Sequence, residues 1–297
     1  FGGTKMKVVR FMGGLGNQFF QYVFLRRLEL FYGVEVKADF SYYKTNSDTI
    51  RQPRILNFNV RLNMISDEEL AIILHLDLRK EGKYVRYKLI RLLEKLTKRG
   101  YYFHKGNEYI NPKRILSYTY YSGYWQSHNY LVGMEDQIKN ELKLKKPLSF
   151  KAQDCVNNVR KENTVFVGIR LGDYLSEENA KIFGFLDSTY YLKGIEIVKV
   201  NVSNPTFIVF SDDPKMAKEK FSTLSSVKNL FFFDDEVSVE EELIIRANCK
   251  HAIISNSTYN WWGAWLIPGN DKMVIAPKQW FADGRKSDIV PPDWITI

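Results

Sequence analysis

The second half of the chain alternates short apolar runs with longer segments of helical spacing, and this alternation restricts the fold more than any other feature. The runs are apolar throughout, which is typical of strands covered on both faces of a parallel sheet. We therefore predict an α/β domain here. The expected strands are 165–169, 206–210, 230–233, 252–254 and 273–276, and the expected helices are 189–200, 214–221, 239–249 and 259–266.

The N-terminal residues show the same alternation once. A strand pattern at 7–11 leads into a glycine-rich loop, a helix and a second strand at 34–38. This order is the usual opening of an α/β domain. The charged, proline-ended stretch at 143–147 is the expected boundary, so we predict an N-terminal domain over 6–147 and a C-terminal domain over 148–297.

Composition and residue usage exclude several classes of protein. With 45% hydrophobic residues among 297, the chain can bury a large core and is not disordered. No uncharged apolar run reaches the roughly 18 residues of a membrane-spanning helix. Cys155 and Cys249 form no disulfide framework, and we expect both to stay thiols in a reducing cytoplasm. The histidines lack the spacing of metal ligands, and no Asp-x-Asp pair occurs that would hold a divalent cation.

The positive charge is concentrated in one segment. Residues 79–114 carry twelve Lys/Arg and three Asp/Glu, a net charge of +9, and the whole chain also has a net charge of +9. Either this segment is a solvated face or it meets an anionic partner. A basic amphipathic pattern at 85–98 favours peripheral contact with an anionic membrane surface. No nucleic-acid recognition module accompanies the charge, so we expect no nucleic-acid partner.

The glycine-rich loop reads Gly13-Gly14-Leu15-Gly16-Asn17-Gln18. It has neither the spacing of a dinucleotide fingerprint nor the Gly-Lys-Ser/Thr of a P-loop. Glycines let a backbone turn sharply and approach a ligand closely, and the two amide side chains would then face that ligand. The alternative is a plain turn in which Asn17 caps the following helix.

Polar residues follow two of the expected strands. Arg170 comes after 165–169, with Gly172 and Asp173 behind it, and a strand-end arginine can bind phosphate oxygens with two hydrogen bonds. Asp173 is a candidate base, or simply the ion-pair partner of Arg170. The other set, after 206–210, either contacts a ribose, base or sugar or caps the helix that Pro214 opens. That set consists of Ser211, Asp212 and Asp213.

The last strand-end segment contains three of the six tryptophans, which are Trp261, Trp262 and Trp265. The residues before them suit a loop that caps a new helix, where backbone N–H groups and hydroxyls form a phosphate seat. The rings either belong to the core or make a wall for a ligand, and we expect them to support the site from the core. The predicted seat consists of Ser255, Asn256, Ser257 and Thr258.

Together these segments resemble glycosyltransferase family 11, the α-1,2-fucosyltransferases. The glycine-rich loop with Phe19-Phe20-Gln21 is similar to the N-terminal motif of that family. Ile169 to Tyr174 is similar to the second half of its His-x-Arg-Arg-Gly-Asp-Tyr motif. Residues 256–265 are close to its Asn-Ser-Ser/Thr-Phe-Ser-Trp-Trp-Gly-Ala-Trp signature. Two departures fall in the second motif, where the family histidine is Gly168 and the second arginine is Leu171.

The resemblance implies a GT-B architecture, with two Rossmann-like domains facing across a cleft. It implies transfer of L-fucose from GDP-β-L-fucose, with inversion, to the 2-hydroxyl of a galactoside, without a metal and on the cytoplasmic side of a membrane. The product would be a surface polysaccharide or oligosaccharide. Two alternatives stay open: another GDP-sugar, favoured by the two departures, or a carbohydrate-binding protein without turnover.

The resemblance also implies roles for individual residues. Arg170 would neutralise the leaving diphosphate, Asp173 is the first carboxylate to test as base, and Asn17 would lie near the reacting centre. Asp212 or Asp213 would contact the guanosine. Donor binding is expected from Gly14, Gly16, Gln18, Gly172, Ser211, Asp212, Asp213, Ser255, Asn256, Ser257 and Thr258.

Overall fold

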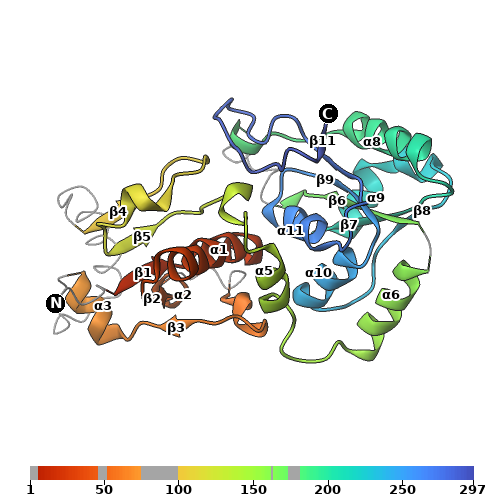
Figure 1. Ribbon diagram of the computed structural model, residues 1–297. Coiled ribbons are helices and arrows are strands. Elements are labelled where there is room, and N and C mark those ends of the chain that lie inside the picture. Colours follow the sequence, from red (N-terminus) through yellow and green to blue (C-terminus); the bar gives the residue numbers. More distant parts are fainter. Residues whose placement is uncertain (1–5, 46–51, 75–99, 162, 173–180) are drawn as a thin grey trace. The chain divides into compact units, whose positions relative to one another are not determined.

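The computed structural model describes residues 6–45, 52–74, 100–161, 163–172 and 181–297 (Figure 1). The chain divides into two compact units, Phe1–Lys145 and Lys146–Ile297, two residues before the boundary predicted from the sequence. Each unit contains one sheet, in which all strands are parallel. The predicted helix at 85–98 and most of the basic segment lie outside the described residues.

The sheet of the C-terminal unit has the strand order β8-β7-β6-β9-β10-β11. The chain fills one side of β6 with β7 and β8 and then crosses to the other side with β9. This reversal between β6 and β9 is the topological switch point at which open α/β sheets bind ligands. The strands are β6 (Thr164–Ile169), β7 (Thr206–Ser211), β8 (Leu230–Phe232), β9 (His251–Ile254), β10 (Val274–Ala276) and β11 (Ile295–Thr296).

Helices cover both faces of this sheet, as the continuously apolar strands require (Figure 1). On one face, Val165, Val167 and Ile169 pack with residues of α8 and with Ala217 of α9 in one buried cluster. On the other face, α10 packs against both α6 and α11. The helices are α6 (Phe150–Arg160), α8 (Ser188–Asn201), α9 (Pro214–Lys220), α10 (Val239–Ala247) and α11 (Thr258–Leu266).

The N-terminal unit has the strand order β3-β2-β1-β5-β4. Its switch point lies between β1 and β5, so the segments that follow these two strands meet at one edge. The strands are β1 (Lys7–Arg10), β2 (Val36–Asp39), β3 (Asn63–Met64), β4 (Tyr101–Phe103) and β5 (Tyr120–Ser122). The sequence at 101–103 and 118–121 predicts strands or extended loops, and these segments contain β4 and the start of β5.

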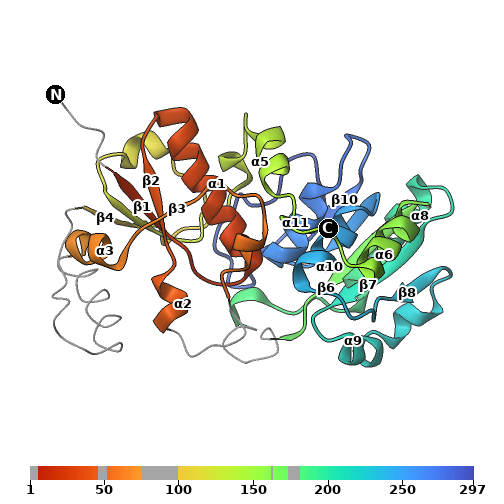
Figure 2. The same cartoon turned by 90° about the horizontal axis from the view of Figure 1, so that it is seen from below.

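The helix α1 (Leu15–Tyr32) runs along β1 and β2 and is buried over most of its length (Figure 2). It ends at Gly33, whose φ of 61° is the left-handed conformation that favours glycine at a helix C-terminus. The sequence predicts a loop from Gly13 to Gln18, with Asn17 as a candidate cap of the helix, whereas the helix begins at Leu15. The other helices are α2 (Ser41–Thr45), α3 (Asp67–Ile73) and α5 (Glu135–Glu141), with short 3-10 turns at Arg54–Asn57, Pro112–Ile115 and His128–Tyr130.

Two predictions about helices have different outcomes. The spacing of Ser66 and Glu69 in the sequence predicts a capping box, and the two residues form it at the start of α3, where each side chain bonds the backbone N–H of the other. The sequence of residues 129–142 predicts a single helix, and this prediction was wrong, because the segment divides into a 3-10 turn and α5. Gly133 separates the two with a φ of 82°, which an α-helix does not accommodate.

Candidate functional site

The candidate site of the C-terminal unit lies at the carboxyl edge of β6, β7 and β9. Pairing across these strands places Ile169 level with Ser211 and Gly168 level with Ile254. The residues that follow the three strands therefore gather at one edge of the sheet. A backbone hydrogen bond from Ser255 N to Gly168 O, 3.0 Å, holds the start of the segment after β9 directly beside β6.

Arg170 is held at this edge by Asp212. The guanidinium Nη1 lies 2.9 Å from Asp212 Oδ2, and the other carboxylate oxygen accepts a hydrogen bond from Leu171 N, also 2.9 Å. A Cβ on Gly172 would collide with the same carboxylate, so glycine is needed here for close packing. The arginine side chain keeps 33% of its surface exposed, which leaves it accessible to an anion. The sequence placed Asp212 against guanosine and did not predict this ion pair.

The neighbours of Asp212 have local structural roles. The Ser211 hydroxyl accepts a hydrogen bond from Asp213 N, 3.1 Å. The Asp213 carboxylate accepts one from Met216 N, 2.9 Å, and so caps α9. Pro214 follows at the first position of the helix, where its missing N–H costs nothing. The helix-capping alternative stated for this segment is therefore confirmed for Asp213.

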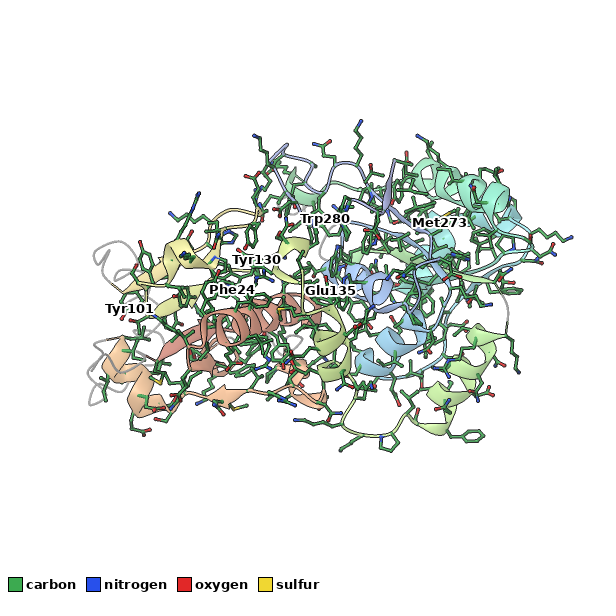
Figure 3. All side chains as sticks on the ribbon, in the orientation of Figure 1. Phe24, Tyr101, Tyr130, Glu135, Met273 and Trp280 are labelled. Atoms are coloured by element: carbon green, nitrogen blue, oxygen red, sulfur yellow. The ribbon has the colours of Figure 1, made fainter. Side chains whose placement is uncertain are left out.

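The segment between β9 and α11 is buried and anchored at several points. Asn256 is 3% exposed, and its Nδ2 donates to Phe183 O and to Trp280 O at 2.5 and 3.0 Å (Figure 3 labels Trp280). Ser257 occupies the N-cap position of α11, and its side chain makes no capping hydrogen bond. Thr258 is the first helical residue and is partly exposed. A rigid segment thus leads into a helix N-terminus, the geometry that favours an anion.

A buried polar chain that the sequence did not reveal lies beneath this segment. Arg246 of α10 is 3% exposed and forms an ion pair with Glu242 through Nη2. Its Nη1 donates to Asn260 Oδ1, and Asn260 Nδ2 donates to Ser255 Oγ at 2.8 Å. The guanidinium also lies 4.8 Å from the ring centroids of both Phe210 and Tyr259. The spacing of these residues in the sequence does not indicate their contacts, because the residues meet only when α10, α11 and β9 pack together.

The three tryptophans of α11 belong to the core, as predicted. Trp261 and Trp262 are fully buried and Trp265 is 8% exposed. Trp261 stacks on Trp265 at 6.2 Å, and its indole N–H donates to Ile289 O at 2.8 Å. Rings that are buried against one another present no face to a sugar. They stabilise the helix that carries the candidate anion site.

In the N-terminal unit, the glycine-rich loop turns at a residue that the site prediction left out. Gly13 has a φ of 79°, whereas Gly14 has a φ of −78° and is the N-cap of α1. Asn17 lies inside the helix, so the alternative in which it caps the helix is wrong. Gly14 is exposed, and no atom lies within 4 Å of where its Cβ would be. This open space suits a close approach by a ligand.

Gln18 and Gly16 are both buried in the first turns of α1. The Gln18 amide donates to Gly13 O at 3.0 Å and to Gln52 O at 2.7 Å, and it accepts from Ile55 N at 2.9 Å. These bonds fix the loop from beneath. Both amide hydrogens are used in this way and the side chain is fully buried, so Gln18 supports the loop instead of facing a donor.

Asn17 meets the segment after β5, which the sequence did not connect with it. Gln126 Nε2 donates to Asn17 Oδ1 at 2.8 Å. Between β5 and Gln126, Trp125 adopts a φ of 55°, which is uncommon for a residue other than glycine. Its ring stacks on Phe24 at 3.6 Å and on His104 at 4.6 Å, and Figure 3 labels Phe24. This packing stabilises the unusual conformation and so places Gln126 beside Asn17.

Asp173 lies outside the described residues, so its roles as base or ion-pair partner stay predictions. Within the part of the chain that the structure describes, no three His, Cys, Asp or Glu side chains gather as a metal site would require. No helix of that part is long and apolar enough to cross a membrane. Cys155 and Cys249 are both free thiols, and burial raises the pKa of Cys155 to about 11 and of Cys249 to about 12.

Two Rossmann-like units, one with an arginine and a helix N-terminus at its switch point, define a GT-B glycosyltransferase. The fold is similar to that of a solved structure of the NodZ alpha-1,6-fucosyltransferase soaked with GDP-fucose. The TM-score is 0.50 and the identity 12%, over 93% of this chain and 96% of that one. The glycosyl transferase family 11 model matches residues 6–297, and the chain belongs to this family.

Curated relatives agree with this assignment. The chain is 31% identical to the O-antigen biosynthesis glycosyltransferase WbnK of Escherichia coli, over 96% of this chain and 98% of the relative. It is 29% identical to an alpha-1,2-colitosyltransferase of Escherichia coli, over 98% of each chain. Human galactoside alpha-(1,2)-fucosyltransferase 1 is 26% identical over 59% of this chain and 52% of its own length. The protein is therefore an enzyme, a glycosyltransferase.

Proposed function

We propose that this enzyme transfers L-fucose from GDP-β-L-fucose, with inversion, to the 2-hydroxyl of a galactoside. The observation that carries the proposal is Arg170 at the carboxyl end of β6, at the same sheet edge as the segment that leads from β9 into α11. A leaving nucleoside diphosphate gains negative charge as the glycosidic bond breaks. A guanidinium and a helix N-terminus already in place stabilise that charge most in the transition state.

The remaining residues have roles that follow from their places. The segment Ser255 to Thr258 offers hydroxyl and backbone N–H donors to the diphosphate, and Asp212 orients Arg170. The N-terminal unit supplies the acceptor side through Asn17 and the open approach at Gly14. Asp173 accepts the proton of the acceptor hydroxyl. The diphosphate is neutralised by these groups, and turnover needs no divalent cation.

One specific observation favours a second candidate for the sugar donor. One relative that matches nearly the whole chain is named an alpha-1,2-colitosyltransferase, and colitose is L-fucose without the 3-hydroxyl. Of the two motif positions that depart from the family pattern, Gly168 lies beside the end of β9, whereas Leu171 is fully buried in the cluster that covers one face of the sheet. The alternative is therefore the same α-1,2 transfer from a GDP-linked 3-deoxy sugar.

The names of the same relatives support a proposal about the acceptor substrate and about where in the cell the reaction takes place. One is named for O-antigen biosynthesis and another for a galactoside acceptor. We therefore propose an acceptor galactoside of a surface polysaccharide or oligosaccharide, modified on the cytoplasmic side. The basic segment at 79–114 keeps the enzyme near anionic lipid.

A scan of nucleotides and nucleotide sugars tests the proposal. Thermal shift measurements should show stabilisation by GDP and none by UDP, ADP or RNA. Turnover with a galactoside should then be faster with GDP-fucose than with GDP-colitose, and EDTA should leave the rate unchanged. Faster turnover of GDP-colitose would favour the second donor. Binding of galactosides without turnover of any GDP-sugar would leave a carbohydrate-binding protein instead.

A further inference from the structure

The space beside Gly168 is filled by a side chain from another element. A Cβ built on Gly168 would lie 2.5 Å from Asn260 Cγ, closer than real Cβ contacts come. The similar family motif has histidine at the position of Gly168 and serine at that of Asn260. The positions of Gly168 and Asn260 are thus in contact in the fold. Loss of the larger side chain at one position makes room for a larger one at the other.

Arg246, Asn260 and Ser255 form a series of hydrogen bonds, and Arg246 determines the direction of each bond in it. A guanidinium has only donors, so the Asn260 atom that faces Arg246 is the acceptor Oδ1. The amide nitrogen Nδ2 therefore faces Ser255 and donates to Oγ. The Ser255 hydroxyl uses its oxygen as acceptor, and its own hydrogen has no acceptor among the described residues.

The first donor in this series of hydrogen bonds is a buried cation, Arg246. Arg246 is 3% exposed, its carboxylate partner among the described residues is Glu242, and its guanidinium lies 4.8 Å from the ring centroids of Phe210 and Tyr259. Its Nε has no hydrogen-bond partner within the part of the chain that the structure describes. In such surroundings hydrogen bonds are stronger than in water and polarise one another along a chain. The hydrogen bonds from Arg246 thereby polarise the Ser255 O–H, at the carboxyl end of β9, and make it a stronger hydrogen-bond donor.

We propose that Asn260 and Arg246 are positioning residues that aim the Ser255 hydroxyl at a phosphate oxygen of the nucleotide. In this protein Asn260 fills the space beside Gly168, the position at which the similar family motif has histidine. The inference rests on the proposed function, since it assigns the anion at β9 to the donor diphosphate. Arg246 and Asn260 act through Ser255, and only Ser255 touches the ligand.

Calorimetric titration of the whole enzyme with GDP and with guanosine tests the inference. The variants are Ser255→Ala, Asn260→Leu and Arg246→Met. Each should weaken GDP binding about tenfold or more, the usual effect of losing one hydrogen bond to a charged group, and leave guanosine binding within about twofold. Equal weakening of both ligands would indicate a merely structural role and would overturn the inference, as would unchanged GDP binding.

Two further comparisons sharpen this test. The double variant Ser255→Ala/Asn260→Leu should bind GDP no more weakly than the weaker single variant, because both changes break one chain. If the double variant instead loses GDP affinity by the product of the two single losses, the inference is overturned. If Asn260→Leu fails to fold, Ser255→Ala with the two ligands still decides the outcome. The matched control is Asn248→Leu. This C-cap residue of α10 lies two residues after Arg246, but its side-chain amide bonds Ile244 O and Arg160 instead of Asn260 or Ser255, so both affinities should stay unchanged.

The contact between Gly168 and Asn260 can be tested separately. Gly168→Ala should lower the melting temperature and weaken GDP binding, and adding Asn260→Ser should recover the melting temperature. No recovery would show that the two positions are independent. Failure of the unmodified enzyme to bind GDP would overturn the proposed function together with this inference. Normal GDP binding with insensitive variants would overturn the inference alone.

Discussion

Arg170 and Asp212 form an ion pair that joins the ends of β6 and β7, with 2.9 Å between Nη1 and Oδ2. Both side chains are partly exposed, at 33% and 22%, so the pair adds little to the stability of the fold. Its effect is on orientation, because the carboxylate is itself fixed by Leu171 N. The arginine therefore reaches the strand edge in one geometry before any ligand arrives.

Asp212→Asn should lower kcat/KM for the donor about 10- to 100-fold, the usual effect of losing a hydrogen bond between charged groups. The amide oxygen can still accept from Leu171 N, so the melting temperature should change by only a few degrees. The matched control is Asp213→Asn, because asparagine caps α9 as well as aspartate does. Steady-state kinetics with both variants would decide, and equal losses would refute the orienting role of Asp212.

Arg170→Ala should reduce turnover by about 100-fold or more, because the charge that stabilises the leaving diphosphate disappears. The side chain is not in the core, so the melting temperature should stay within a few degrees of the wild-type value. Arg170→Lys keeps the charge and loses the planar fork, and should recover only part of the rate. Turnover near normal in the alanine variant would remove Arg170 from the proposed mechanism.

Gly13→Ala and Gly14→Ala form a matched pair that separates folding from ligand approach. At Gly13, alanine meets a φ of 79° and a Cβ position 2.7 Å from Asn17 Nδ2, so unfolding free energy should fall by about 1–2 kcal/mol. At Gly14 nothing obstructs a Cβ, so stability should hold. If the open space at Gly14 admits the substrate, its alanine variant should nevertheless show a raised KM. Denaturant titration and kinetics on both variants check this, and an unchanged KM for Gly14→Ala would contradict the substrate contact.

The strands of the C-terminal unit could be predicted because each buried strand is a continuous apolar run. The exception is β11, which has two exposed residues and no such pattern. The start of α1 was missed because Gly16 and Asn17 look like loop residues. Gly13 makes the turn alone, and the helix begins two residues later.

The candidate site was predictable only in part. Residues that end apolar strands could be expected to meet at one edge of a parallel sheet, as Arg170 and Ser255 do. Their partners could not be predicted, because they depend on strand register and helix packing. Asp212 meets Arg170 through the pairing of β6 with β7, and Gln126 meets Asn17 only where β5 lies beside β1.

Glu241→Gln should give a stability difference that depends on pH. Burial alone would raise the pKa of Glu241, but hydrogen bonds from the backbone N–H groups of Ser149 and Ser238 lower it to about 2, against 4.5 without these contacts. The folded-state pKa is depressed, so the carboxylate stabilises the fold above pH 4.5, and this contribution is lost as the pH falls toward 2. The variant should be less stable by about 1 kcal/mol at neutral pH, after allowance for solvent screening, and should approach the wild type near pH 2. Urea unfolding across this range checks it, and a constant difference would show that the charge is irrelevant.

Trp261→Phe distinguishes a core ring from a sugar platform. The indole of Trp261 is fully buried and donates to Ile289 O, so phenylalanine leaves that carbonyl without its donor and a gap in the stack with Trp265. We expect the unfolding free energy to fall by about 2–4 kcal/mol from the lost hydrogen bond and the lost packing. Because the ring faces other rings, the variant that remains folded at 20 °C should keep its affinities for GDP and for galactosides within about twofold. Urea unfolding followed by tryptophan fluorescence, together with calorimetric titration, measures both quantities. Normal stability with lost galactoside binding would place Trp261 on a sugar-binding surface, contrary to its burial in α11.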